Sequence, residues 1–161
     1  MDTTSLNYIK NVNNKEGWAY AEHPVSSYFL LHFLRKRDKD SREVENHALG
    51  LPKGSVIILS QKPPFGIVRY LTHVVELVND GVEDQPQWKN NDHDGILRWV
   101  KVLWAANFND VDTIPIDIEV LKVPAGWGWF DTKAKSLKST NLMSKWGNID
   151  SLRTHLGSIF N

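Results

Sequence analysis

Three strand-like segments follow one another in the middle of the chain, and no helix pattern separates them. They run from Val56 to Ser60, from Gly66 to Val78 and from Ile96 to Trp104, and each is rich in β-branched or aromatic residues. Parallel neighbours are normally joined by a helix, so strands that follow each other directly indicate an antiparallel or mixed sheet. This order predicts an α+β fold in which a curved or closed sheet carries helices at its sides.

The segments on either side of this region carry other patterns. Val25 to Arg37 has apolar residues at helical spacing, serines near its start and basic residues in its last turn, so we expect a helix there. A C-terminal helix is expected from about Ile149 to Ile159, within a region spanning 147–160. We further expect short strands at 18–21 and 114–123, a short helix or a loop at 37–50, and a polar lead-in at 1–16.

Composition excludes several classes of protein. The chain has 161 residues, of which 41% are hydrophobic, so it is long enough for one domain with a sizeable core. It lacks cysteine, which excludes disulfides and thiolate zinc sites. Lys+Arg and Asp+Glu both number 19, which argues against the broad basic face of a non-specific nucleic-acid coat. Without an apolar run of about 20 residues or a signal-like start, we expect a cytoplasmic protein with no membrane partner.

The strand candidates are accompanied by a succession of motifs. In chain order these are "WAYAEHP", "PKGSVIIL", "THVVELV", a loop tryptophan, "ILRWVKVLW" and "VDTIP". The succession resembles the EVE and YTH branch of the PUA-like superfamily over most of residues 17–121. The resemblance implies a single EVE/YTH-type domain over 1–161, with a PUA-like curved sheet or small β-barrel flanked by helices. Two features depart from the family pattern, namely the Lys53-Gly54-Ser55 turn, where an acidic residue after glycine is more usual, and Glu22, where a small hydroxyl residue is common.

The resemblance also implies a function. It identifies the chain as a non-catalytic domain that recognises a modified base, such as a methylated cytosine or adenine, flipped out of DNA or RNA into an aromatic cage. Prokaryotic relatives of this type often serve as the sensing part of modification-dependent restriction or defence systems. The expected partners are therefore a nucleic acid that contains a modified base and a nuclease, either as a separate chain or as a fused domain. No cofactor and no metal ion are expected.

Several residues are candidates for the pocket that the resemblance implies. Trp88 stands in a polar, turn-rich run and corresponds to the loop aromatic that forms one wall of the cage, where stacking on a base is worth about 1–3 kcal/mol. A structural alternative is that Trp88 covers the end of the sheet. Tyr20 is a candidate for contact with the ring of the base, and Phe65 is a candidate for the lip of the pocket. Hydrogen bonds to the polar edge of the base are expected from Glu22, His23 and Ser60. The alternative is that these five are ordinary core and loop residues.

The segment after residue 125 adds aromatic rings and positive charge. Trp127 and Trp129 in "GWGWF" form either a stacking platform or core anchors. A basic strip without acidic residues follows between Thr132 and Asn148, and it is either a phosphate-binding surface or a solvated face. Its members are Lys133, Lys135, Lys138 and Lys145.

Two other classes of function remain open. The run "NDHDG" (91–95) has the composition of a metal-binding cluster, but no second group of ligands at metal-site spacing accompanies it. A ribonuclease of the ASCH type, from the same superfamily, remains open because its site needs only a few Lys, Arg and Tyr residues. Arg69 and Tyr70 are the candidates for such a site. Exposed tryptophans also fit a protein–protein interaction module, because this residue is enriched at interface hot spots.

Overall fold

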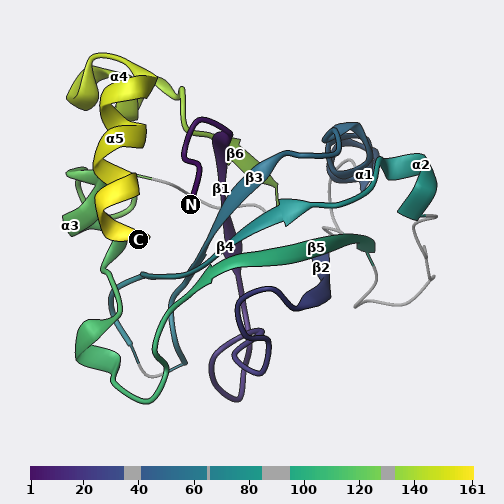
Figure 1. Cartoon of the computed structure of the whole chain (residues 1–161), viewed down its shortest axis with the longest axis horizontal. Coiled ribbons are helices and arrows are strands. Elements are labelled where there is room, and N and C mark those ends of the chain that lie inside the picture. The colour runs from purple at the N-terminus through teal and green to yellow at the C-terminus, as the bar shows by residue number, and fades with distance from the viewer. Residues whose placement is uncertain (35–40, 65, 85–94, 128–132) are drawn as a thin grey trace.

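A curled sheet of six strands forms the centre of the structure, in the order β2-β5-β4-β3-β1-β6 (Figure 1). The computed structural model describes residues 1–34, 41–64, 66–84, 95–127 and 133–161. The strands are β1 (Leu6–Val12), β2 (Tyr28–Leu34), β3 (Val56–Gln61), β4 (Tyr70–Leu77), β5 (Gly95–Ala105) and β6 (Ala134–Ser136). The helices are α1 (Ser41–Gly50), α2 (Gly81–Asp84), α3 (Asp117–Leu121), α4 (Thr140–Trp146) and α5 (Ile149–Ile159), with a short 3-10 helix at Val111–Thr113.

The sheet is mixed, and the prediction of an α+β fold with a curved sheet is confirmed. β1 and β3 run parallel, and every other neighbouring pair is antiparallel. β3, β5 and α5 lie where the sequence predicts two strands and the C-terminal helix. The strand predicted at 66–78 is shorter in the structure: β4 begins only at Tyr70, and the peptide N–H of Gly66 bonds to the carbonyl of Pro63 instead of to a neighbouring strand.

The helix predicted at 25–37 is wrong, because β2 occupies residues 28–34. Apolar residues fill nearly every position of this segment, so helical spacing and strand alternation fit it equally well. Pairing with β5 decides the outcome: Phe29, Leu31 and Phe33 point into the core and are at most 4% exposed, while Tyr28 on the other face is 53% exposed. Tertiary pairing here overrides the local signal.

The polar lead-in predicted at 1–16 is also wrong in its centre. Residues 6–12 form β1, which lies inside the sheet between β3 and β6. The strand escapes detection because Lys10 interrupts its apolar pattern. Lys10 is nevertheless only 2% exposed, and its ammonium lies 4.7 Å from the centre of the Phe33 ring, where a cation–π contact offsets part of the cost of burial.

Neither short strand is formed, at 18–21 or at 114–123. Residues 19–22 form a turn in which Tyr20 has a left-handed φ of 61°, and the Ala19 N–H bonds to the side chain of Gln61 instead of to the backbone of a strand. In the second segment only Ile116 bridges to the sheet, opposite Tyr70, and the chain then forms α3. Of the segment 37–50, the structure describes residues 41–50, which form the helix α1.

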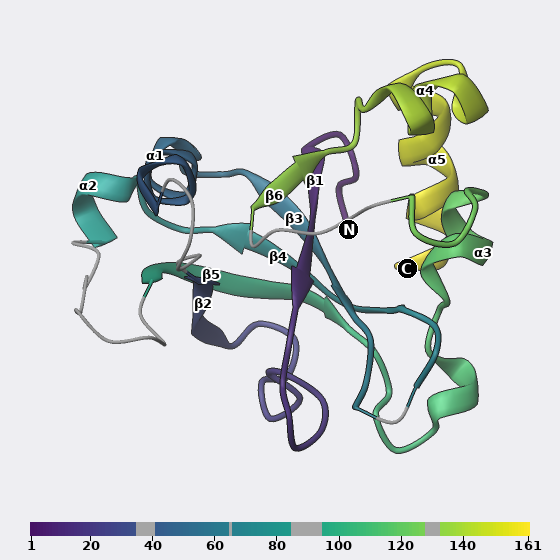
Figure 2. The same ribbon diagram turned by 180° about the vertical axis from the view of Figure 1, so that it is seen from behind.

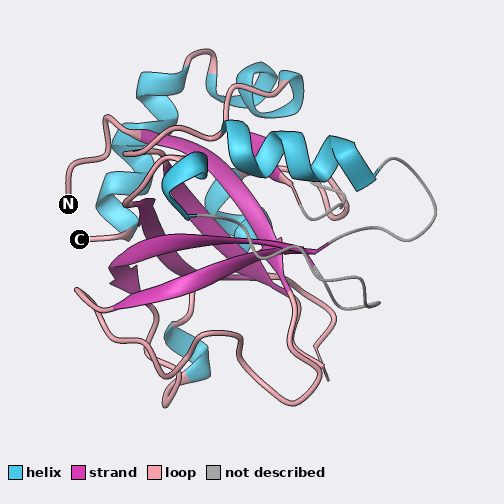
Figure 3. Cartoon of the chain, turned by 90° about the vertical axis from the view of Figure 1, so that its right-hand side faces the viewer, coloured by secondary structure: helices cyan, strands magenta, loops and turns pink. Residues whose placement is uncertain are grey.

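Two apolar clusters lie on opposite faces of the curled sheet. One fills the inside of the curve and includes Phe33, Ile57 and Leu59 with α1. The other packs the outer face, including Ile58, against α3, α4 and α5. Figure 2 shows these three helices gathered at one end of the molecule, far from α1 and α2, and Figure 3 shows the curl of the sheet from the side. In the part of the chain that the structure describes, no helix is both long and apolar enough to cross a membrane.

A buried ion pair joins β5 to α2, at the end of the molecule where α1 and α2 lie. The side chains of Arg98 and Asp84 are both 0% exposed, and Arg98 Nε lies 2.7 Å from a carboxylate oxygen of Asp84. The Arg98 guanidinium also donates to the carbonyls of Ala48, Leu51 and Asn79. One side chain therefore satisfies carbonyls at the C-terminal end of α1 and fixes the segment that leads into α2.

Candidate functional site

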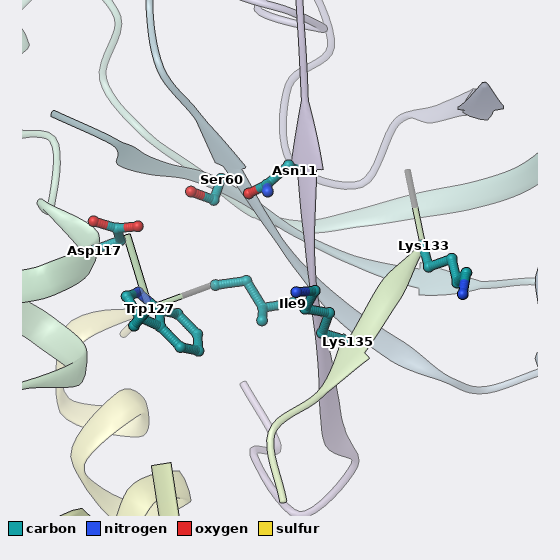
Figure 4. Close-up of a pocket in the computed structure, with 7 residues that line it drawn as sticks. All are labelled: Ile9, Asn11, Ser60, Asp117, Trp127, Lys133 and Lys135. Atoms are coloured by element: carbon teal, nitrogen blue, oxygen red, sulfur yellow. The ribbon is translucent and has the colours of Figure 1, made fainter. Parts of the chain in front are cut away.

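Two adjoining cavities lie where the ends of β1 and β3 meet α3 and the residues just before 128. The larger has a volume of about 170 Å³ and the smaller about 10 Å³, which is the space of a single water molecule. Asp117 and Trp127 border both, so the two cavities form one site (Figure 4). The remaining lining residues are Ile9, Asn11, Ser60, Lys133 and Lys135 in the smaller cavity, and Lys62, Ile67, Val68, Arg69, Ile118, Ala125 and Gly126 in the larger.

Backbone pairing positions Asp117 in this site. The Leu71 N–H bonds to the carbonyl of Pro115, and the Asp117 N–H bonds to the carbonyl of Arg69, so the start of α3 is held against the start of β4. The carboxyl of Asp117 is only 4% exposed. It accepts a hydrogen bond of 2.6 Å from the N–H of Ile118 and one from the indole of Trp127, whose ring lies beside it in Figure 4.

Burial controls the proton affinity of this carboxyl. It raises the pKa of Asp117 from 3.8 to about 6, although the N–H of Ile118, the guanidinium of Arg69 and the indole of Trp127 all act to lower it. Burial also lowers the pKa of Arg69, and the charge of Asp117 opposes that change. Perturbed titratable groups beside a cavity are a common property of functional sites.

We expect the stability of the protein relative to Asp117→Asn to fall as the pH rises from about 4 through about 6. Between the unfolded pKa of 3.8 and the folded pKa of about 6, the folded chain holds a proton that the unfolded chain has released. This stabilising contribution is complete below the lower value and is lost above the higher one. Urea unfolding of both proteins between pH 4 and 8 measures the difference.

His73 changes the stability with pH in the direction opposite to Asp117, and this effect cancels when the wild type is compared with Asp117→Asn. Burial lowers the pKa of this fully buried imidazole from 6.5 to about 4, so acid destabilises the fold through His73 in both proteins equally. A difference between the two proteins that stays constant across the range would mean that Asp117 titrates near its ordinary pKa.

Ser60 supplies a second polar group. It is the fifth residue of β3, 1% exposed, and its hydroxyl has no hydrogen-bond partner within the described ranges. In Figure 4 this hydroxyl and the carboxyl of Asp117 face the same space. Because buried hydroxyls are nearly always paired, an unpaired one at a cavity wall indicates a place for a water molecule or a ligand atom.

The structure brings together only some of the residues predicted for the pocket and the phosphates. Ser60, Trp127 and Lys135 line the site. Lys133 also borders it, but its ammonium forms an ion pair with Glu43 of α1, and Figure 4 shows the side chain pointing away from the others. Lys138 and Lys145 are exposed, and neither borders the two cavities.

Tyr20, Glu22 and His23 belong to a different cluster, next to β2. The rings of Tyr20 and His23 stack on Phe29, with centroid distances of 4.2 and 4.9 Å, and the Tyr20 hydroxyl accepts a hydrogen bond from the N–H of His32. Glu22 lies 3.4 Å from His23. These three residues line neither cavity.

Three other predicted pocket residues, Phe65, Trp88 and Trp129, lie outside the described residues. Sequence reasoning missed Asp117 as a site residue, and it considered Arg69 only for a nuclease. The signal for Asp117 is an acidic residue between two isoleucines in the largely apolar run "IPIDIEVL", where a buried charge has to find partners or shift its pKa. Comparisons of this chain with protein-family models, with curated proteins and with solved structures give no match.

Proposed function

We propose that this chain is a non-catalytic nucleic-acid-binding domain that recognises a modified base of DNA or RNA in the cavity bordered by Trp127. The resemblance of its motifs to EVE and YTH domains supports this function, and the curled sheet flanked by helices is compatible with a PUA-like fold. The proposal includes a role as the sensing part of a modification-dependent restriction or defence system, with a nuclease as partner.

The observation that carries the proposal is the position of Trp127. Its half-buried indole borders the cavity beside a buried carboxyl and close to an unpaired hydroxyl. A base has two apolar faces and a polar edge, so one ring plane for stacking and a few hydrogen-bonding groups for the edge are what its recognition requires. Lys62 and Arg69 line the larger cavity, where cations suit the phosphates next to a flipped base.

Replacing Trp127 with alanine is expected to weaken binding of the preferred oligonucleotide by about 5- to 150-fold, which corresponds to the loss of one stacking contact. Fluorescence polarisation with labelled deoxy- and ribo-oligonucleotides measures the affinity. Each oligonucleotide carries one modified base, and its unmodified counterpart is measured beside it. Trp127→Phe keeps a ring and is expected to retain part of the affinity.

Trp99→Ala is the matched control, because Trp99 is 41% exposed on β5 and does not line either cavity. It is expected to bind as the wild type does. Trp88→Ala, measured in the same series, tests the cage residue that the motif resemblance implies. Equal affinity for modified and unmodified oligonucleotides would overturn the proposed function, and full affinity in Trp127→Ala would move the stacking role to another ring.

A ribonuclease of the ASCH type is the second candidate. Arg69 lines the larger cavity together with Lys62 and Asp117, and a carboxyl with a pKa of about 6 has the proton affinity of a general base. Turnover of RNA that is lost in Asp117→Asn would establish this activity. An oligomeric state that depends on concentration, with no response to nucleic acid, would instead indicate a protein–protein interaction module.

A further inference from the structure

We propose that a second site, on the outer face of the sheet, binds a small organic cation with an apolar body. A cavity of about 580 Å³ lies there between the two chain ends and strands β3, β4 and β5. It shares no lining residue with the two cavities around Asp117, so this inference does not depend on the function proposed above. Its volume is in the range of small-molecule sites, about 300–1,000 Å³.

The aromatic wall of this cavity is built on β5. An irregularity in the pairing of β4 with β5 lets Leu103 and Trp104, which are adjacent in the chain, both pack on the outer face of the sheet. The indole of Trp104 is half-buried, and the buried ring of Phe160 lies 4.8 Å from it at an angle of 54°. This contact holds the indole in place at the cavity, and tryptophan is the side chain whose ring attracts cations most strongly.

Glu76 of β4 supplies a negative charge beside this wall. In the sheet it lies between Val56 of β3 and Lys101 of β5, and its half-buried side chain borders the cavity. Its carboxylate has no ion-pair partner within the described ranges, since even Lys101 is not within ion-pair distance. A carboxylate that is partly removed from water and lacks a partner is stabilised by a cation that comes close to it.

The other charges around the cavity add to this preference. Asp2 also borders it, and the N–H and hydroxyl of Thr4 donate to this carboxylate and lower the pKa of Asp2, so it is ionised at neutral pH. The C-terminal end of α5 reaches the cavity through its cap residue Phe160, and a helix carries partial negative charge at this end. Against these stands the ammonium of Met1, which lies 3.4 Å from the side-chain oxygen of Asn161 where the two chain ends meet (Figure 3).

These features together determine the chemistry of the occupant. Val56 and Leu103 give the cavity an apolar floor, which suits an aliphatic or aromatic body. The carboxylates of Asp2 and Glu76 repel an anion, and a neutral apolar molecule gains nothing from them. A protonated or quaternary amine gains both the carboxylates and the face of Trp104, so an amine with one apolar group is the ligand that uses every wall.

The test compares two probes of the same shape that differ in charge. The ammonium probe is (2-benzamidoethyl)trimethylammonium, and the neutral probe is N-(3,3-dimethylbutyl)benzamide, in which a carbon atom replaces the charged nitrogen. At pH 7.5 and low ionic strength, the wild type is expected to bind the ammonium probe at least about 3-fold more tightly, through one cation–π contact and one partly exposed ion pair. An NMR titration of the backbone amide signals measures both affinities and locates the probe.

Two substitutions remove the groups that hold the cation. Trp104→Leu is expected to weaken binding of the ammonium probe by about 2- to 30-fold, the range for a cation–π contact. Glu76→Gln is expected to weaken it by about 2- to 5-fold, the range for a partly exposed ion pair. Trp104→Phe keeps a ring against Phe160 and is expected to retain part of the affinity, which separates loss of the contact from a defect in folding.

Glu45→Gln and Trp99→Leu are the matched controls. Glu45 is another half-buried carboxylate, on α1, and Trp99 is another tryptophan of β5; neither borders the cavity. Both variants are expected to bind the ammonium probe as the wild type does. Absence of binding, equal affinity for the two probes, or undiminished affinity in folded Glu76→Gln and Trp104→Leu proteins would overturn the inference. Tighter binding of the basic dipeptide N-acetyl-lysyl-phenylalanine amide at the same residues would also overturn it and assign the cavity to a protein segment.

Discussion

Asp84→Ala is expected to lower the free energy of unfolding by about 3–5 kcal/mol, because it leaves the buried guanidinium of Arg98 without its counter-ion. The carboxylate of Asp84 also accepts hydrogen bonds from the side chain of Asn79, at 2.8 Å, and from the backbone N–H of Trp99, at 3.2 Å. Alanine removes all three interactions, and water cannot replace them at a side chain that is 0% exposed. Urea denaturation followed by circular dichroism measures the loss.

Two comparisons separate the charge of this pair from its packing. Asp84→Ala combined with Arg98→Met is expected to be more stable than Asp84→Ala alone, since no uncompensated charge remains buried. Asp150→Ala removes the acidic partner of Arg153 in an ion pair of 3.7 Å, and Asp150 is 87% exposed, so little change is expected. Similar losses in Asp84→Ala and Asp150→Ala would show that burial does not determine the contribution of the Arg98 pair.

Phe33→Ala is expected to destabilise the protein by a similar amount, about 3–5 kcal/mol, through lost burial and an internal cavity. Phe33 is 0% exposed on the inner face of the sheet, where it pairs with Ile96 of β5. Its ring also lies 4.7 Å from the ammonium of Lys10. Removing the ring therefore creates a void and leaves a buried cation in a less favourable place, and thermal unfolding monitors both effects together.

Phe33→Leu keeps most of the volume but not the aromatic face, so the difference between the alanine and leucine variants isolates the packing contribution. Tyr28→Ala, on the 53% exposed face of the same strand, is expected to change stability by less than about 0.5 kcal/mol. A large loss at Tyr28 together with a small one at Phe33 would contradict the facing of β2 in the sheet.

The sequence predicts best the segments whose pattern matches their burial. β3 and β5 lie in the middle of the sheet and read as apolar or alternating runs, and α5 has one apolar face. β2 and β1 are assigned wrongly because information outside each segment decides them. β2 needs the partner strand β5 to choose between two periodicities, and β1 needs tertiary neighbours of Lys10, among them the ring of Phe33, to make a buried lysine acceptable.

The candidate site is predictable only in part for the same reason. Ser60 and Trp127 are recognisable because a polar end of a strand and a glycine-flanked ring are local signals. The role of Asp117 depends on its approach to Arg69 and Trp127, and that approach is created by the bridge between Ile116 and Tyr70. No spacing rule within the chain encodes that contact. Tyr20 and His23 show the converse, since a plausible pair of pocket residues instead stacks on Phe29.

The place of β1 between β3 and β6 has a consequence for synthesis of the protein on the ribosome. β1 is translated before both of its partners, because Ile9 pairs with Ile58 on one side and with Lys135 on the other. Both contacts require closing long loops, which slows folding. The edge of β1 that pairs with β3 therefore stays unmatched until residues 56–61 have been translated, and the other edge stays unmatched until residues 134–136 follow.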